Sequence, residues 1–431
     1  MNIAILGFAR EGRSLLKFLK KAPKFKGAKI TILDKKLNKN YLHRLDRFDL
    51  LFRSPGIPYN LPEIQQAIKG GLKISSATKL FFDLCPAKVI GVTGTKGKGT
   101  TSTLIYKILK EADKDVYLAG NIGKPALNIL PELSKKSLVI LELSSFQLQD
   151  LKKSPTIAIV LDIFPDHLDS HKNMREYLAA KTNICAHQTK KDVVFYFKNN
   201  PLSQKMALHS RGRHIPISAP DNLSKNKIMA ATVAAHLNCS RATIDRVIKN
   251  FHGMKHRLEL IRNIKISRTT KQHSGILNNM RVLFYDDSAS TNPQTAAVAV
   301  LSFAPNKLTN SPTNQLTILI AGGKDKNLNY TPLAKAIKKS GNVKLVILFG
   351  ENKIKIKKTL ETGDQKPNIK LAKNLKSAVD LAYQSARKLS NQPTNQLINI
   401  ILSSGAASFD MFKDYADRGQ QFKKIVKKIA R

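Results

Sequence analysis

Residues 91–100 have the sequence Gly-Val-Thr-Gly-Thr-Lys-Gly-Lys-Gly-Thr. They follow the apolar pair Val89-Ile90 and precede a helix-like stretch, 101–111. A glycine-rich loop between a strand and a helix turns backbone N–H groups toward one anion, and the helix adds its positive N-terminal end. Lys98 suits the terminal phosphates of a nucleotide, and Thr100 suits a magnesium ion. The stretch predicts a phosphate-binding loop (the P-loop); a flexible turn is the alternative, because the spacing departs from G-x-x-x-x-G-K-[ST].

The length and composition predict a globular protein of several domains. A chain of 431 residues is too long for one ordinary core, and 42% hydrophobic residues are enough for two or three. No apolar run approaches the length of a membrane span, and the chain enters a strand directly after Met1, so we expect no membrane insertion and no signal peptide. Its three scattered cysteines indicate reduced thiols, and we expect a cytoplasmic protein.

The charge is strongly positive, with 73 Lys and Arg against 30 acidic residues. Such a surface attracts polyanions, and nucleic acid is the first partner to consider. The lysines are nevertheless spread over the whole chain, without a basic tail or a basic motif interleaved with aromatic residues. We interpret the excess as a background that favours anionic substrates, and expect no specific nucleic-acid partner.

The N-terminal segment has the pattern of a βαβ unit. Strand-like runs at 2–7 and 29–34 flank a helical stretch, 13–21. The first turn has the spacing of a dinucleotide fingerprint with its middle glycine replaced by Ala9, and Asp34 ends the second strand, where an acid would meet a ribose or base. The pattern favours a Rossmann-like domain for a nucleotide diphosphate over an NAD-dependent oxidoreductase.

Strand-like and helical runs alternate along the rest of the chain, which predicts parallel sheets covered by helices. We expect an α/β protein of three domains: a Rossmann-like domain at 1–87, a central P-loop ATPase-like domain at 88–258 and a C-terminal Rossmann-like domain at 259–431. The expected strands are 138–141, 157–161, 282–285, 316–321, 345–349 and 398–402, with a helix at 174–187.

Several polar groups follow these strands. Glu142 ends an apolar strand, and its place after the P-loop favours a magnesium ligand over a simple strand-end charge. The sequence Asp-His-Leu-Asp-Ser-His at 166–171 suits a cation-binding set or a polar turn equally. Asp287 ends another strand and can accept a hydrogen bond from a ribose, a base or a substrate. Turns at 322–326 and 403–409 suit an anion.

Two near-copies of a polar, proline-interrupted segment occur at 307–316 and 388–397. They are either a paired functional element or solvated loop expansions, and we favour loop expansions.

With these motifs in place, the chain resembles the Mur ligases, in particular the members that add D-glutamate to UDP-N-acetylmuramoyl-L-alanine. The motifs stand in the family's order over essentially the whole chain. Besides the P-loop they are the sequences at 120–127, 142–148, 165–171, 256–259, 287–288 and 407–419.

The resemblance implies an ATP-dependent ligase of peptidoglycan precursor synthesis. A substrate carboxylate would take the γ-phosphate of ATP, and D-glutamate would attack the resulting acyl phosphate. ATP would lie between the second and third domains, with the third binding the amino acid and closing over ATP. The expected ligands are UDP-N-acetylmuramoyl-L-alanine, D-glutamate and ATP, and we expect a monomer.

The resemblance also implies roles for single residues. Catalysis would rest on Lys98, Glu142, His167 and Lys181. ATP would be bound by Gly94, Thr95, Gly97, Lys98, Gly99, Thr100, Arg257 and Asp287. The UDP substrate would be bound by Asp34, Ser54, Pro55, Gly56 and Asn121. D-Glutamate would be bound by Thr291, Lys326, Ser408, Phe409 and Tyr415.

Two Mg²⁺ sites are implied as well, with ligands from Thr100, Glu142, His167 and a carbamylated Lys181. By itself, a lysine on a helix would be a solvated residue. The chain departs from the family pattern at Lys96, Gly99, Ala289 and 224–227.

Two other functions remain open. One is a related ligase, either a sibling that uses another amino acid or a folylpolyglutamate synthase, and the sequences at 143–148 and 407–412 argue against both. A diverged nucleotide- or nucleic-acid-binding protein without ligase activity would bind polyanions in a salt-sensitive way and would not turn over ATP.

Overall fold

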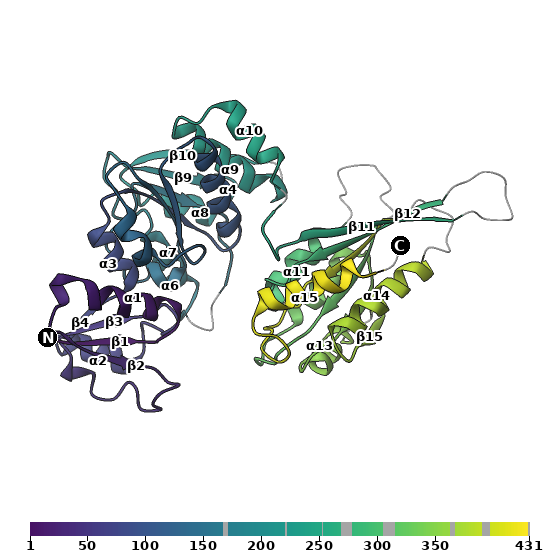
Figure 1. Ribbon diagram of the computed structural model, residues 1–431, viewed down its shortest axis with the longest axis horizontal. Helices are drawn as coiled ribbons and strands as arrows, with labels where there is room; N and C mark the ends of the chain where they lie inside the picture. The colour runs from purple at the N-terminus through teal and green to yellow at the C-terminus, as the bar shows by residue number, and fades with distance from the viewer. Residues whose placement is uncertain are drawn as a thin grey trace. The chain divides into compact units, whose positions relative to one another are not determined.

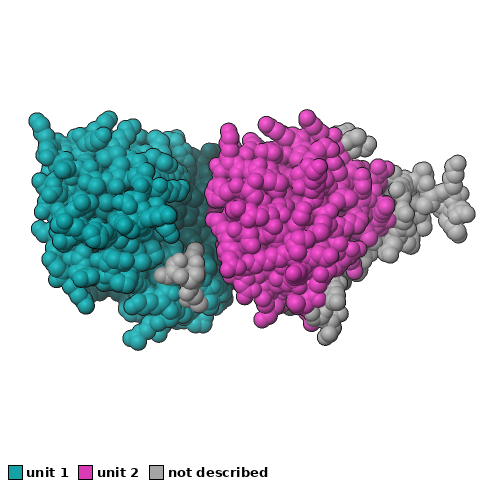
Figure 2. All heavy atoms as spheres, turned by 90° about the horizontal axis from the view of Figure 1, so that it is seen from below, with its two compact units in different colours: residues 1–251 teal, residues 252–431 magenta. Residues whose placement is uncertain are grey.

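The computed structural model describes residues 1–166, 171–219, 222–251, 253–268, 278–304, 315–362, 367–389 and 397–429. It forms two compact units, 1–251 and 252–431 (Figure 2). The first unit contains two parallel sheets and the second contains one mixed sheet. The predicted α/β class is therefore confirmed, whereas the antiparallel β11–β12 pair of the second unit departs from the expected parallel order. Most of each near-copy segment and all of His167 lie outside the described residues.

The N-terminal sheet has the strand order β2-β1-β3-β4, with every pair parallel. Its helices follow the strands in turn (Figure 1). Helix α1 begins three residues before the predicted start. Glu11 lies in its first turn, where its negative charge interacts favourably with the positive end of the helix dipole. The elements are β1 (Asn2–Leu6), α1 (Arg10–Lys21), η1 (Pro23–Phe25), β2 (Lys29–Leu33), η2 (Leu45–Arg47), β3 (Leu50–Arg53), α2 (Pro62–Lys69), β4 (Lys73–Ser75) and α3 (Ala77–Leu84).

The central sheet has the order β10-β9-β8-β5-β7-β6 and is parallel throughout. Its middle strands are continuous apolar runs because helices cover both faces. The strands are β5 (Lys88–Thr93), β6 (Val116–Gly120), β7 (Leu138–Glu142), β8 (Ile157–Val160), β9 (Val193–Phe197) and β10 (Arg213–Ile217). The helices are α4 (Lys98–Glu111), α5 (Ala126–Ile129), η3 (Leu130–Glu132), α6 (Ser145–Leu148), α7 (Met174–Thr182), α8 (Pro201–Ala207), α9 (Asn222–His236) and α10 (Arg241–Lys249).

Helix α7 ends at Thr182, although the apolar pattern predicts a helix to residue 187. The Asn183 side-chain amide donates to the carbonyls of Leu148 (2.9 Å) and Gln149 (3.3 Å). From there the chain continues in tight turns, in which Ile184 N donates to Lys181 O. This tertiary contact replaces the next turn of helix, which a sequence pattern does not reveal.

The sheet of the second unit has the order β11-β12-β16-β13-β14-β15, with the β11–β12 pair antiparallel and the others parallel. Its strands are β11 (Glu259–Arg268), β12 (Asn278–Asp286), β13 (Gln315–Ala321), β14 (Val343–Leu348), β15 (Ile369–Leu371) and β16 (Leu397–Leu402). Its helices are α11 (Pro293–Leu301), α12 (Thr331–Ser340), α13 (Lys353–Leu360), α14 (Leu375–Leu389) and α15 (Tyr415–Lys427).

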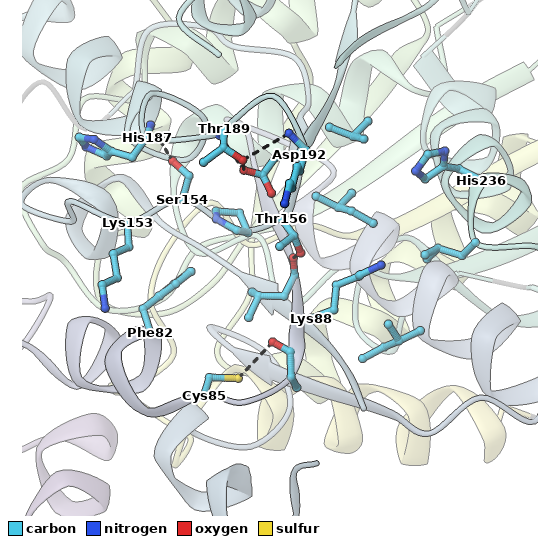
Figure 3. A pocket seen from close by; sticks show the side chains of 18 of the residues that line it. Phe82, Cys85, Lys88, Lys153, Ser154, Thr156, His187, Thr189, Asp192 and His236 are labelled. Atoms are coloured by element: carbon cyan, nitrogen blue, oxygen red, sulfur yellow. Dashed lines mark hydrogen bonds between the residues drawn. The ribbon is translucent and has the colours of Figure 1, made fainter. Parts of the chain in front are cut away.

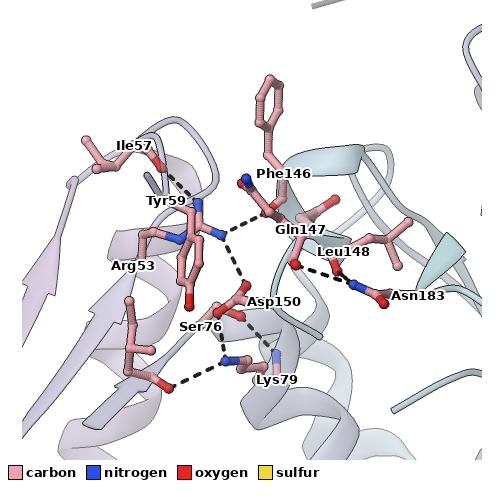
Figure 4. A network of polar contacts seen from close by, with 12 residues as sticks. Arg53, Ile57, Tyr59, Ser76, Lys79, Phe146, Gln147, Leu148, Asp150 and Asn183 are labelled. Atoms are coloured by element: carbon pink, nitrogen blue, oxygen red, sulfur yellow. Dashed lines mark hydrogen bonds and ion pairs between the residues drawn. The ribbon is translucent and has the colours of Figure 1, made fainter. Parts of the chain in front are cut away.

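A buried ion-pair network joins the two sheets of the first unit (Figure 4). Arg53, at the end of β3, is 2% exposed and donates to Ile57 O (2.8 Å) and Phe146 O (2.9 Å). Its guanidinium also pairs with Asp150 at 3.2 Å, and Lys79 pairs with the other carboxylate oxygen at 2.7 Å. Arg53 thus connects the N-terminal sheet to the segment that follows α6.

Replacing Arg53 by Met should destabilise the first unit. The change leaves Asp150 buried with only Lys79 as its cation, and breaking a buried pair typically costs about 3 kcal/mol or more. Chemical denaturation of the full chain measures the loss, with the exposed Lys17→Met on α1 as the matched control. Equal unfolding midpoints for Arg53→Met and the wild type would contradict this role.

Candidate active site

The predicted nucleotide site lies at the carboxyl ends of three neighbouring strands. Strand β5 stands between β8 and β7, and all three run parallel. The P-loop follows β5, Glu142 ends β7, and the segment after β8 runs to Asp166. Because the carboxyl ends of parallel strands meet at one edge, the topology brings these groups together.

Two glycines give the P-loop its course. Gly94 has φ +155° and Gly97 has φ +83°, and a Cβ at Gly97 would overlap the side-chain amide of Asn226 on α9. Helix α4 starts at Lys98, so Gly99 and Thr100 lie in its first turn and not in the loop. The N-terminal end of α4, which begins at Lys98, is the predicted anion-binding element of the site.

Lys98 folds back over the loop that precedes it. Its ammonium donates to Gly94 O at 2.9 Å and Thr95 O at 3.1 Å. The Thr95 hydroxyl lies 2.9 Å from Tyr177 OH and from Phe164 N, so it fastens the loop to α7 and to the segment after β8. The Thr100 side chain, in contrast, makes no hydrogen bond within the described part of the chain.

Lys181 is buried beside the P-loop. The residue is 2% exposed, and its Nζ donates to Gly94 O at 3.0 Å. It also lies 4.9 Å from the centroid of the Tyr177 ring. Burial, followed by repulsion from Lys98, lowers the pKa of Lys181 well below its ordinary value, although Asp166 and Glu142 act in the opposite direction.

Glu142 is also nearly buried, at 5% exposure. Its backbone carbonyl accepts from Asn121 N at 3.1 Å, and a Cβ at Gly120 would overlap that carbonyl. The turn that carries the exposed Asn121 is therefore fixed to the end of β7. Arg10 of α1 donates to Asn121 O and Gly123 O, which ties the same turn to the N-terminal sheet.

The segment 166–171 is only partly described. His167 and residues 168–170 lie outside the described residues, so the structure offers no placement for that predicted metal ligand. His171 is 2% exposed, with Nε2 2.9 Å from Ser145 Oγ and its ring stacked on Phe146 at 5.1 Å. Asp166 is half-buried near Lys181 and Lys96.

Two of the predicted UDP-substrate residues hold the turn that follows β1. Asp34 accepts from Phe8 N at 2.7 Å, and the Ser54 hydroxyl donates to Gly7 O at 2.6 Å. Hydrogen bonds from the backbone N–H groups of Lys36 and Phe8 lower the pKa of Asp34. Pro55 and Gly56 follow Ser54 in the same turn.

In the second unit, three loops leave the adjacent parallel strands β12, β16 and β13 at their carboxyl ends. Asp287, after β12, accepts from Ser290 Oγ at 2.5 Å and from Ser403 Oγ, after β16, at 2.6 Å. Lys324, after β13, donates its N–H to Ala407 O at 2.8 Å. The loops that carry the predicted amino-acid residues are thus joined to one another.

The predicted residues of this unit differ in exposure. Asp287 is 5% exposed, and burial raises its pKa to about 6 against the hydrogen bonds that it accepts. Lys326 Nζ lies 5.5 Å from the centroid of the exposed Phe409 ring. The remaining predicted residues are the buried Ser408, the half-buried Thr291 and the exposed Tyr415 and Arg257.

Sequence reasoning missed two contributors to the P-loop. Asn226 closes over Gly97 and accepts from the Thr101 hydroxyl at 3.2 Å. Tyr177 is fully buried and holds Thr95. The motif at the start of α9 departs from the family pattern, so only the fold reveals that Asn226 reaches the P-loop.

A cavity of about 890 Å³ in the first unit lies elsewhere (Figure 3). Residues at the amino ends of the strands line it, among them Lys88 of β5, Ile157 of β8 and Val193 of β9, together with His187 and His236. The P-loop follows the carboxyl end of β5, so this cavity is not the predicted nucleotide site.

Comparisons with known proteins identify the family. Residues 92–264 match the family model of the Mur ligase middle domain. The UDP-N-acetylmuramoylalanine--D-glutamate ligase of Acetivibrio thermocellus is 33% identical, and the match covers 99% of this chain and 96% of the relative. The chain therefore belongs to the Mur ligase family.

Two solved structures show the same fold at low identity. The UDP-N-acetylmuramate-alanine ligase of Thermotoga maritima aligns with a TM-score of 0.52 and 15% identity over 99% of both chains. The folylpolyglutamate synthase of Mycobacterium tuberculosis, solved with ADP and AMPPCP, aligns with a TM-score of 0.58 and 11% identity over 81% of this chain and 94% of that one. In the described part of the chain, no helix is long and apolar enough to cross a membrane.

Proposed function

We propose that the protein is an ATP-dependent ligase that adds D-glutamate to UDP-N-acetylmuramoyl-L-alanine. The observation that carries the proposal is the convergence of Lys98, Glu142 and Lys181 on the P-loop. It is supported by the full-length similarity to a ligase of that name. The ATP-dependent formation of an amide bond is the reaction of this enzyme class.

The reaction gathers negative charge at two steps. The substrate carboxylate attacks the γ-phosphorus of ATP, releases ADP and becomes an acyl phosphate. The amine of D-glutamate then attacks the acyl carbon. The C–O bond to phosphate breaks, and phosphate leaves with its electron pair. Lys98 and the N–H groups of α4 would stabilise the phosphoryl oxygens, so catalysis is mostly electrostatic and positional.

The residues beside the P-loop also fit a magnesium ion. The Thr100 hydroxyl has no protein partner among the described residues, and Glu142 supplies a nearly buried carboxylate at the end of β7. Hydroxyl and carboxylate oxygens are the ligands that Mg²⁺ prefers. When bound, the ion would neutralise charge on the phosphates of ATP. We propose that His167 and a carbamylated Lys181 would hold a second magnesium ion.

Lys181 fits carbamylation by CO₂. A neutral amine attacks CO₂, forms an N–C bond and releases a proton, so the reaction needs a lysine of lowered pKa. Burial and the nearby Lys98 favour the neutral amine of Lys181. The product carries a negative charge close to Lys98 and would add a carboxylate beside Glu142.

The remaining residues complete the proposed assignment. Asp34, 54–56 and Asn121 would bind the UDP substrate, and Arg257 and Asp287 would bind ATP. The group Thr291, Lys326, Ser408, Phe409 and Tyr415 would bind D-glutamate. The boundaries between the three domains would lie near residues 87 and 258. The protein would act in the cytoplasm as a monomer.

The direct test is phosphate release from ATP in the presence of UDP-N-acetylmuramoyl-L-alanine. We expect turnover with D-glutamate and none with L-glutamate, L-alanine or no amino acid. Lys98→Ala should abolish turnover while the protein stays folded, because the γ-phosphate loses its cation. Binding of ATP without turnover for any amino acid would overturn the proposal in favour of a binding protein.

Lys181→Ala should be inactive and should regain part of its activity with formate or acetate. A short carboxylate can enter the space left by the side chain and restore the negative charge. Lys181→Arg is the matched variant, because it keeps a cation that cannot be carbamylated. We expect it to be inactive both with and without added carboxylate. Normal rates for Lys181→Ala without added carboxylate would exclude the carbamate.

A further inference from the structure

A strained turn presents Arg257. The turn closes with a hydrogen bond from Arg257 N to Met254 O (3.1 Å). Its third residue, His256, has φ +62°, a conformation that turns usually reserve for glycine, and Leu258 has φ +47°. Left-handed backbone at non-glycine residues persists only where surrounding contacts enforce it, and it is frequent at functional sites.

Contacts within the second unit hold both residues that flank Arg257. His256 N donates to Glu259 Oε2 at 2.8 Å, and Ala289 N donates to His256 O at 3.0 Å. Leu258 N donates to Asp287 Oδ1 at 3.2 Å. The Arg257 side chain, by contrast, is exposed. The backbone is therefore fixed on each side of an arginine that faces outward.

The His256 side chain belongs to a charged cluster behind the turn. Its Nδ1 lies 2.6 Å from Asp286 Oδ2, at the buried end of β12. Lys423 of α15 places its Nζ 2.6 Å from Glu259 Oε2 and 3.7 Å from Asp286 Oδ2. Gly419, one helical turn earlier, packs so closely that a Cβ there would overlap His256 Nδ1.

The cluster has the residue types of a metal site, but its carboxylates already have a positively charged partner. His256, Glu259 and Asp286 offer atoms within 4.8 Å of one another. The ammonium of Lys423 already lies against both carboxylates. The cluster therefore takes its positive charge from Lys423, and its contacts to His256 hold the turn.

We propose that His256 is a positioning residue: anchored by Asp286, with Glu259 and Lys423, it fixes the turn that presents Arg257 to ATP. The inference rests on the proposed ligase function, in which Arg257 binds ATP. An arginine whose backbone is already set loses less freedom when ATP binds, and its guanidinium reaches the phosphates in one geometry. Substitutions in the cluster should therefore lower the efficiency with which ATP is used, although the substituted residues do not contact ATP.

A double-mutant cycle between Lys423→Met and Arg257→Ala tests this coupling. Lys423→Met should lower kcat/KM for ATP about tenfold, because the turn loses its fixed geometry. The KM values for UDP-N-acetylmuramoyl-L-alanine and D-glutamate should stay unchanged. In the Arg257→Ala background, Lys423→Met should cause no further loss, since both changes act through one side chain.

The neighbouring Lys424→Met is the matched control, because Lys424 is exposed on the same helix and lies outside the cluster. It should leave all three substrates' kinetics unchanged. Gly419→Ala should reproduce the ATP defect by displacing His256, and Gln420→Ala is its control. Thermal unfolding of each variant checks that the protein is folded, and the milder Glu259→Gln replaces any variant that is not.

Losses of equal size in the wild-type and Arg257→Ala backgrounds would overturn the proposal. So would a defect spread equally over all three substrates. The same cycle is run on ATP affinity by titration calorimetry, where the same coupling is expected. A wild-type protein without D-glutamate-dependent turnover would instead overturn the proposed function, while the calorimetric cycle still decides the role of the turn.

Discussion

The proposed active site depends on Lys181, a lysine buried where the charged form of its side chain is disfavoured. Lys181 reaches the inner side of the P-loop and donates to Gly94 O. Desolvation and Lys98 disfavour its ammonium form, although Glu142 and Asp166 are close enough to attract a cation. A neutral amine or an anionic carbamate relieves this conflict, because either removes the second positive charge from the vicinity of Lys98. The geometry of the P-loop and the chemistry of Lys181 are thus one constraint.

The fold could be predicted from the sequence largely because its signals are local. The glycine loop between an apolar run and a helix located the P-loop, and strand ends located Glu142 and Asp287. Parallel order then placed these groups at the carboxyl edges of their sheets, as the structure shows for β5 and its neighbours β7 and β8.

The rest of the site depends on contacts between distant segments. Nothing in the pattern of α7 distinguishes Lys181 from a solvated lysine, because burial is decided by what packs against the helix. Asn226 meets Gly97 across more than a hundred residues, and its motif is irregular. The left-handed backbone at His256 and Leu258 was equally hidden, since neither residue is a glycine.

In both units, hydrogen bonds and close packing fix the backbone next to the proposed site residues. In the first, the Thr95 hydroxyl and Asn226 fix the P-loop that precedes α4. In the second, Asp287 and the cluster around His256 fix the turn before β11. Such preorganisation suits a reaction in which charge develops in the transition state, because the groups that stabilise the charge are already in place.

Whether the buried Lys181 carries a carbamate can be measured by carbon NMR of the protein equilibrated with ¹³C-labelled bicarbonate. We expect one carbamate resonance in the wild-type enzyme that is absent from Lys181→Arg. Identical spectra for the two proteins, with the wild type active under the same conditions, would contradict it.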